Sequence, residues 1–119
     1  MTAKEAHFLC HRDELAPGHM RGFVVDGKDV VLCRKGDEFT ALADRCSHQG
    51  AKLSGGALGG TNIACGVGQY KFVRGGEVIE CPRHGYEYGT NDGRSLFDPR
   101  FRVKSYAVVI RGEDVLVEL

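Results

Sequence analysis

The stretch MRGFVVDGKDVVLCRKGDEFTALAD, residues 20–44, decides the fold class. It contains three short runs rich in valine, phenylalanine and threonine, separated by Asp26-Gly27 and by residues 35–37, Lys-Gly-Asp. Such Gly-containing pairs and triplets favour tight turns between antiparallel strands. In the third run, apolar residues at every second position from Phe39 to Ala43 predict a strand with one face toward a core. The stretch therefore predicts three antiparallel strands joined by hairpin turns.

The C-terminal end is the second strand-rich region. It predicts a strand over residues 102–110, a turn over residues 111–114 and a last strand whose buried side holds Val115, Val117 and Leu119. The only helical turn that the pattern supports is at residues 12–15, just before a Pro-Gly pair. With so little helical pattern, the chain is predicted to be all-β, a small antiparallel sandwich or barrel.

Size and charge restrict the class of protein. A chain of 119 residues has the size of one domain. Sixteen basic and sixteen acidic side chains cancel, so no overall field attracts nucleic acid or an anionic membrane. The N-terminus lacks the basic and then apolar order of a signal peptide, and no apolar run approaches the length of a membrane span. We therefore expect a single cytoplasmic domain, residues 1–119, with neither nucleic acid nor membrane as a partner.

Cysteines and histidines give the clearest functional signal. Five cysteines, an odd number with uneven spacing, favour metal binding or burial over a disulfide framework. Two of them stand beside a histidine, in CSHQG at residues 46–50 and in CPRHGYEY at residues 81–88. Cys46-x-His48 and Cys81-x-x-His84 offer two sulfur and two nitrogen ligands, which suit either tetrahedral zinc or an iron–sulfur cluster. Zinc sites usually pair like ligands, whereas loops with one ligand of each kind suit a binuclear centre.

The paired motif resembles the Rieske [2Fe-2S] family, whose C-x-H and C-x-x-H pairs it matches position by position. The resemblance covers DRCSHQGAKLSGG at residues 44–56, CPRHGYEYGTNDGR at residues 81–94 and the C-terminal strands. It implies a Rieske-like β fold with an inserted two-loop cluster-binding subdomain at about residues 45–100. It also implies that Cys46 and Cys81 hold one iron while His48 and His84 hold the other. Around the cluster the resemblance places Gln49, Gly50, Pro82, Arg83, Gly85, Tyr86 and Tyr88.

The ligand set bears on the reduction potential. Two neutral imidazoles in place of two thiolates make the cluster less negative, so an added electron meets less repulsion. High-potential members of the family carry an extra cysteine in each loop and a serine that hydrogen-bonds a sulfide. Here Ala51, Arg83 and Tyr86 stand at or near those places, while Tyr88 matches the family tyrosine. We therefore expect a midpoint at the low end of the Rieske range, on the order of −150 to 0 mV.

A cluster whose four protein ligands are all filled leaves no position for a substrate. The resemblance therefore implies a one-electron carrier, not an enzyme on its own, similar to ferredoxins that pass electrons from a flavin-dependent reductase to a terminal ring-hydroxylating oxygenase. A basic docking rim of Arg45, Lys52 and Arg83 would suit an acidic partner, although solvated surface charge explains these residues equally well. The alternatives are a small subunit of another oxidoreductase such as a nitrite reductase, a cluster-based redox sensor, and a colourless zinc-binding module.

One departure from the family pattern lies between the two ligand loops. Thirty-two residues separate His48 from Cys81, roughly twice the number in compact Rieske ferredoxins. The insertion, at about residues 58–80, contains Cys65 and is expected to form a lobe or flap beside the cluster. Because loop lengthening has a mild entropic cost, the insertion leaves the ligand assignment intact.

Other candidate sites have simpler structural explanations. Cys33 follows three apolar residues in a predicted strand and is expected to be a buried core thiol. The segment HFLCH, residues 7–11, contains two histidines and a cysteine but reads better as an edge strand than as a second metal site. The glycine-rich residues 55–60 lack the lysine and hydroxyl residue of a phosphate-binding loop and are interpreted as a flexible loop.

Overall fold

The computed structural model describes residues 5–46, 51–66, 69–82, 86–96, 98 and 100–119, with only the backbone described at residues 60–66 and 69–76. The strands are β1 (Ala6–His11), β2 (Met20–Val25), β3 (Lys28–Lys35), β4 (Glu38–Ala43), β5 (Ala57–Gly66), β6 (Gln69–Glu80), β7 (Glu87–Gly89), β8 (Ser105–Tyr106), β9 (Val108–Arg111) and β10 (Asp114–Glu118). The described residues also form two short 3-10 helices, η1 (Arg12–Glu14) and η2 (Leu53–Gly55). The all-β prediction is confirmed, as is the helical turn after residue 11.

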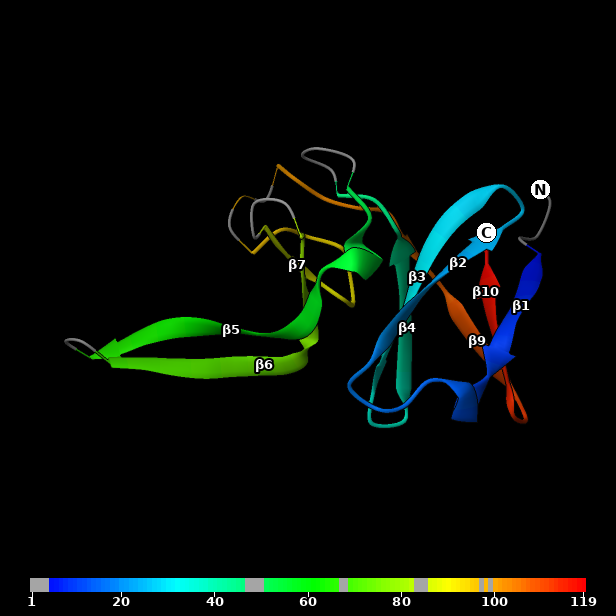
Figure 1. The fold of residues 1–119 in the computed structure, drawn as a ribbon, viewed down its shortest axis with the longest axis horizontal. Helices are drawn as coiled ribbons and strands as arrows, with labels where there is room; N and C mark the ends of the chain where they lie inside the picture. Colours follow the sequence, from blue (N-terminus) through cyan, green and yellow to red (C-terminus); the bar gives the residue numbers. More distant parts are fainter. Residues whose placement is uncertain (1–4, 47–50, 67–68, 83–85, 97, 99) are drawn as a thin grey trace.

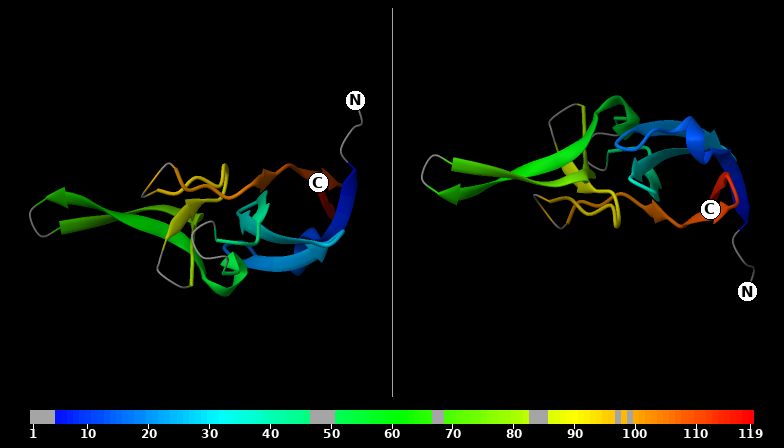
Figure 2. Two further views of the ribbon diagram at one scale, coloured as in Figure 1. Left: turned by 90° about the horizontal axis from the view of Figure 1, so that it is seen from above. Right: turned by 90° about the horizontal axis from the view of Figure 1, so that it is seen from below.

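The strands form three antiparallel sheets with the orders β1-β10-β9, β2-β3-β4-β8 and β5-β6-β7. The β2-β3-β4-β8 sheet lies between the other two (Figure 1). The molecule measures 51 × 28 × 26 Å, and its long axis follows the β5–β6 hairpin, which projects away from β1, β9 and β10 in both views of Figure 2. β1 lies at a sheet edge, which confirms the edge-strand interpretation of residues 7–11.

The middle of β3, an inner strand of the central sheet, is buried on both faces. Along β3, Val30 and Leu32 enter one core with Val115 and Val117 of β10. Val31 and Cys33 enter a second core on the other face. β4 also contributes to both cores, because Ala41 lies in the first, with Phe39 packed against it on the predicted face, and Leu42 lies in the second. A strand between two apolar layers buries every residue, which explains the unbroken apolar run at residues 30–33.

The hairpin turns of the central sheet are as predicted. Val25 pairs with Lys28, and the two residues between them both have positive φ, 50° for Asp26 and 75° for Gly27. A two-residue turn of this conformation matches the twist of the flanking strands. The next turn closes on the pair Lys35 and Glu38. The sequence signals therefore fixed the register of β2, β3 and β4.

The single strand predicted at residues 102–110 is wrong. β8 pairs with β4 in the central sheet, whereas β9 pairs with β10 in the outer sheet. The chain crosses from one sheet to the other at Ala107, whose carbonyl accepts a hydrogen bond from the Glu118 amide at 2.9 Å. One straight strand cannot pair with both β4 and β10, so the chain breaks its pairing where the two sheets meet.

The expected lobe at about residues 58–80 consists of β5 and β6, which at 10 and 12 residues are the longest strands described. The inserted segment is an antiparallel hairpin with register shifts at Gly59/Thr61 and Ala64/Gly66. The flexible-loop interpretation of residues 55–60 is also wrong, because Gly55 ends η2 and the rest of the run continues into β5.

The base of the hairpin is fixed to the rest of the molecule. Val78 and Ile79 of β6 are buried, and Leu58 of β5 packs against the second core. A Cβ on Gly56 would lie 1.8 Å from the Glu80 carbonyl oxygen, so only glycine allows the two strands to approach here. The Lys35 ammonium pairs with the Glu77 carboxylate beside this base. The hairpin therefore leaves the molecule in a direction set by its packed base.

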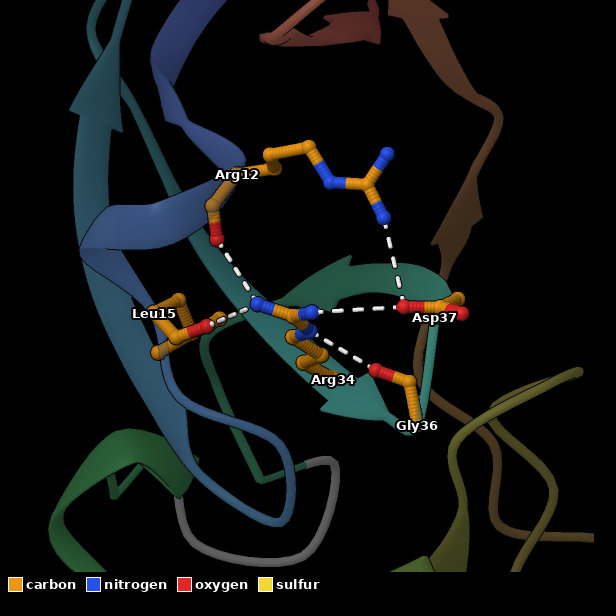
Figure 3. Close-up of polar contacts among 5 residues, drawn as sticks. All are labelled: Arg12, Leu15, Arg34, Gly36 and Asp37. Atoms are coloured by element: carbon orange, nitrogen blue, oxygen red, sulfur yellow. Dashed lines mark hydrogen bonds and ion pairs between the residues drawn. The ribbon is translucent and has the colours of Figure 1, made fainter.

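A buried arginine joins two segments that are distant in sequence (Figure 3). Arg34 of β3 is 8% exposed. Its Nη1 donates to the carbonyl oxygens of Arg12 at 2.8 Å and Leu15 at 2.7 Å, and its Nε donates to the Gly36 carbonyl at 2.7 Å. Its Nη2 also pairs with the exposed Asp37 at 3.4 Å. Arg34 thus holds the η1 segment against the β3–β4 turn.

Candidate metal centre

Two strand ends deliver two cysteines to the same core. Cys46 follows β4 after two intervening residues, and Cys81 follows β6 directly. Both side chains are 2% exposed, and both belong to the second core, together with Cys33 and Tyr88. Thirty-five positions apart in sequence, the two thiols are therefore brought into one apolar environment.

Each cysteine begins a loop that its own backbone closes. The Cys46 amide donates to the Ala51 carbonyl at 2.7 Å, and the Cys81 amide donates to the Tyr86 carbonyl, also at 2.7 Å. Both bonds span five positions, so the two loops are closed in the same way. His48 and His84 fall inside these two spans, outside the described residues. The same is true of four neighbours that the sequence placed around the centre, Gln49, Gly50, Arg83 and Gly85.

Tyr88 lies at one of the two cysteines. Its side chain on β7 is fully buried, and its Oη is 3.2 Å from Cys46 Sγ. A thiolate can only accept a hydrogen bond, whereas a phenol hydroxyl can donate one. When Cys46 is a thiolate, Tyr88 is therefore the donor.

The other two described neighbours are more peripheral. Tyr86 is half-buried, and its ring meets the Phe101 ring edge-on at a centroid distance of 6.0 Å. Pro82 is exposed and lies against η2, where its Cδ is 3.2 Å from a Cβ built on Gly56. Leu53 of η2 is fully buried in the same core as the two cysteines. Pro82 and Leu53 thus place η2 next to the second ligand loop and the core that holds both cysteines.

The proposed basic rim is only partly described. Arg45 and Lys52 are both exposed, and Arg83 lies outside the described residues. Lys52 Nζ is 3.7 Å from Asp29 Oδ1, so an acidic group accompanies one of the two described cations. The charge of this surface is therefore mixed.

The remaining described cysteines do not belong to the ligand loops. Cys33 is 2% exposed, as expected, and burial raises the pKa of its thiol to about 12, with the negative charge of Asp44 as a second cause. Cys10 of β1 is buried in the other core, where burial also raises its thiol pKa. Among the residues with a described position, no three His, Cys, Asp or Glu side chains gather into a metal site. This includes the histidine-rich end of β1.

Asp44 and Ser54 are site residues that the sequence did not single out. Asp44 Oδ1 accepts a hydrogen bond from the Ser54 amide at 2.7 Å, and Oδ2 accepts one from Ser54 Oγ at 2.6 Å. The two residues flank the first ligand loop, one on each side. An aspartate two positions before a cysteine carries no signal in a single sequence, because its partner is known only from the fold.

The described part of the centre fits an iron–sulfur cluster. Two buried thiols from distant segments share one core, and one of them has a hydroxyl group at its sulfur. The thiolate ligands of an iron–sulfur cluster are stabilised by burial and by hydrogen bonds to their sulfur atoms. No helix in the described part of the chain is long and apolar enough to cross a membrane.

Comparison with known proteins agrees with this geometry. The model of the Rieske [2Fe-2S] domain matches residues 5–107. The ferredoxin component of biphenyl 2,3-dioxygenase from Rhodococcus jostii strain RHA1 is 30% identical over 112 residues, which cover 93% of this chain and 90% of that protein. The ferredoxin component of the naphthalene 1,2-dioxygenase system from Pseudomonas aeruginosa is 31% identical over 107 residues, covering 89% of this chain and 88% of that protein.

Solved structures give the same family. The ferredoxin of carbazole 1,9a-dioxygenase from Nocardioides aromaticivorans IC177 superposes with a TM-score of 0.77 at 28% identity, covering 95% of this chain and 96% of its own. A nitrite reductase small subunit from Mycobacterium tuberculosis has a TM-score of 0.80 at 24% identity, covering 99% of this chain and 97% of its own, which shows a shared fold. This chain therefore belongs to the Rieske [2Fe-2S] family, and it is an electron-transfer protein whose cofactor is a [2Fe-2S] cluster.

Proposed function

We propose that this chain is the ferredoxin component of a ring-hydroxylating oxygenase system, working in the cytoplasm between a flavin-dependent reductase and a terminal oxygenase. The observation that supports this best is the extent of the match. The match spans 93% of this chain and 90% of the ferredoxin component of biphenyl 2,3-dioxygenase. A related structure is a complex of reduced oxygenase and oxidised ferredoxin in carbazole 1,9a-dioxygenase, at 27% identity and a TM-score of 0.76.

The ligand assignment is part of this proposal. Cys46 and Cys81 hold one iron, and His48 and His84 hold the other. The cluster supplies a site that takes up and releases one electron at a time. The chain buries the two cysteine sulfurs, closes both loops through the cysteine amides and supplies a hydroxyl at Cys46. Residues 1–119 act as one domain, with residues 45–100 as its cluster-binding subdomain.

The midpoint potential follows from the hydrogen bonds around the sulfurs. Tyr86, at the position of the family's serine, packs its ring against Phe101. The described hydroxyl at a ligand sulfur is that of Tyr88. Since Tyr86, Arg83 and Ala51 stand at or near the places of the serine and the extra cysteines of high-potential members, the cluster should have a midpoint on the order of −150 to 0 mV. A redox titration followed by visible absorption measures this, and a midpoint near the top of the Rieske range, about +300 mV, would contradict it.

Replacement of Tyr88 by phenylalanine should lower the midpoint potential by roughly 20 to 60 mV. A hydrogen bond contributes about 0.5–1.5 kcal/mol. A tenfold change in a one-electron equilibrium corresponds to about 59 mV. In the unmodified protein, the Tyr88 hydroxyl stabilises the reduced cluster more than the oxidised one, because the sulfurs of the reduced cluster are more negative. Tyr106→Phe, on β8 and away from Cys46, is the matched control. Equal midpoints for both variants would show that the Tyr88 hydroxyl does not act on the cluster.

The carrier role is tested by electron transfer to a partner. Chemically reduced protein, mixed in a stopped-flow instrument with the terminal oxygenase from the same host, should be reoxidised by one electron per chain. If Arg45 and Lys52 contribute to docking, the second-order rate should fall as ionic strength rises. No transfer to any oxygenase of the host, together with stoichiometric copurification with a larger oxidoreductase subunit, would instead support the small-subunit alternative.

The β5–β6 hairpin can be shortened to separate its role from that of the cluster. Replacing residues 62–72 by Asn-Gly between the paired Thr61 and Val73 keeps Leu58, Val78 and Ile79 in place. Because those contacts hold the base, iron content should stay at the level of the unmodified protein. Iron and sulfide analysis measures this. A loss of iron would show that the distal hairpin is needed to form the centre.

A further inference from the structure

A buried carboxylate lies beside the first ligand loop. Asp44 is 3% exposed and stands two positions before Cys46. Its two oxygens accept the hydrogen bonds from the amide and hydroxyl of Ser54 at 2.7 and 2.6 Å. The Asp44 amide donates to the Asp29 carbonyl at 3.0 Å, which ties the residue to β3. The two ends of the segment that contains Cys46 and His48 are thus joined through one side chain.

The fold makes room for this pair at a glycine. A Cβ on Gly22 of β2 would lie 2.8 Å from Asp44 Oδ2 and 2.9 Å from Ser54 Oγ. Such distances are too short for a real Cβ, so a side chain at residue 22 would displace the carboxylate or the hydroxyl. The pair is therefore packed closely against β2.

In the described part of the chain, the charge of Asp44 is balanced by the hydrogen-bond dipoles of Ser54 and not by a cation. Among the ion pairs of the described residues, Lys52 pairs with Asp29 at 3.7 Å, and none includes Asp44. The charge nevertheless acts on the second core, because it adds to burial in raising the pKa of the Cys33 thiol. Cys33 shares that core with Cys46 and Cys81. A negative charge at this position opposes the addition of an electron to a cluster bound there.

We infer that Asp44 is a positioning residue for the [2Fe-2S] centre, which holds the first ligand loop through Ser54 and lowers the midpoint through its buried negative charge. The inference rests on the proposed binding of the cluster by Cys46. It assigns part of the expected low midpoint to the charge of Asp44. The two effects of Asp44 can be separated, because an asparagine at this position keeps the shape of the side chain and removes its negative charge.

The test compares three variants of the full chain, each assayed for iron and inorganic sulfide, for the EPR spectrum of the reduced state and for midpoint potential. Asp44→Asn should keep the iron content and EPR spectrum, because its amide oxygen still accepts the Ser54 amide proton. Its reduction should be favoured about tenfold, a rise of about 59 mV. Asp29→Asn is the matched control, since Asp29 lines the same surface cavity but is half exposed and pairs with Lys52. Its reduction equilibrium should change less than about threefold, because exposed charge is screened.

Ser54→Ala keeps the carboxylate and removes one of its donors. The midpoint should therefore fall, and the cluster should be lost faster during incubation with an iron chelator. If Asp44→Asn and Asp29→Asn have equal midpoints, the charge effect is overturned. If Ser54→Ala matches the unmodified protein in midpoint and cluster half-life, the positioning role is overturned, even where Asp44→Asn fails to fold. Unmodified protein without iron and sulfide would overturn the proposed function itself.

Discussion

Replacement of Cys81 by serine should leave a protein without the red-brown colour and EPR signal of a Rieske cluster. Serine offers a hydroxyl group that stays protonated at neutral pH, so it is a poor substitute for a thiolate ligand. Loss of a group that hydrogen-bonds a metal ligand typically lowers metal affinity 10- to 100-fold, and loss of the ligand itself should lower the affinity by at least about that much. Iron content measured on protein purified without oxygen should therefore fall by more than about tenfold.

Cys33→Ala supplies the control for this loss. Cys33 has the same 2% exposure as Cys81 and lies in the same core, so both changes disturb similar packing. Of these two residues, Cys81 begins a loop closed by its own amide, whereas Cys33 lies within β3. The Cys33 thiol has a pKa raised to about 12 and stays protonated at neutral pH, unlike a cluster ligand. Cys33→Ala should keep its iron. Equal loss of iron from both variants would mean that core damage, not ligation, explains the effect.

Replacement of Arg34 by methionine should lower the free energy of unfolding by about 2–4 kcal/mol, because buried acceptors that lose their donor cost about 1–3 kcal/mol each. The carbonyl oxygens of Arg12, Leu15 and Gly36 all accept from this guanidinium (Figure 3). Methionine fills much of the same volume and cannot donate to any of them. Urea denaturation, followed by far-UV circular dichroism, measures the change.

Two further variants sharpen the Arg34 experiment. Arg34→Lys keeps the charge but cannot reach three carbonyl groups at fixed angles, so its stability should be intermediate. Arg100→Ala removes an exposed arginine that pairs with its near neighbour Asp98 at 2.7 Å, and it should be indistinguishable from the unmodified protein. If Arg34→Met unfolds at the same urea concentration as Arg100→Ala, the buried guanidinium does not stabilise the fold.

Local signals predicted the central sheet well. Asp26-Gly27 has the composition of a two-residue hairpin turn, and both residues have the positive φ that this turn needs. The register of β2, β3 and β4 follows from the two turns. The division of the C-terminal strand at Ala107 could not be predicted in this way. It depends on which sheets receive β8 and β9, and residues 102–110 carry no local mark of that choice.

The inserted hairpin was missed for a related reason. Residues 55–60 and the pair at 75–76 are rich in glycine, which locally favours turns and loops. Pairing between β5 and β6 overrides that preference, with register shifts at Gly59/Thr61 and Ala64/Gly66. Strand preferences depend strongly on the neighbouring strand, and that neighbour is unknown from one segment alone.

In the candidate site too, the sequence predicted residues that stand in short motifs and missed a contact between distant segments. The spacing of Cys46 and Cys81 within short motifs was sufficient to select them, and the structure buries both in one core. Tyr88 was selected through the family resemblance, and its hydroxyl lies at Cys46 Sγ. Asp44 was not selected, because the bond to Ser54 joins residues on opposite sides of a loop. Contacts that close a loop become visible only once the loop is folded.

The most direct test of the account is elemental analysis of native protein purified without oxygen, combined with an assay for inorganic sulfide. The account predicts about two iron atoms and about two sulfide ions per chain, with negligible zinc. One zinc ion per chain without sulfide would contradict it, since the same cysteine and histidine ligands would then hold a structural zinc site.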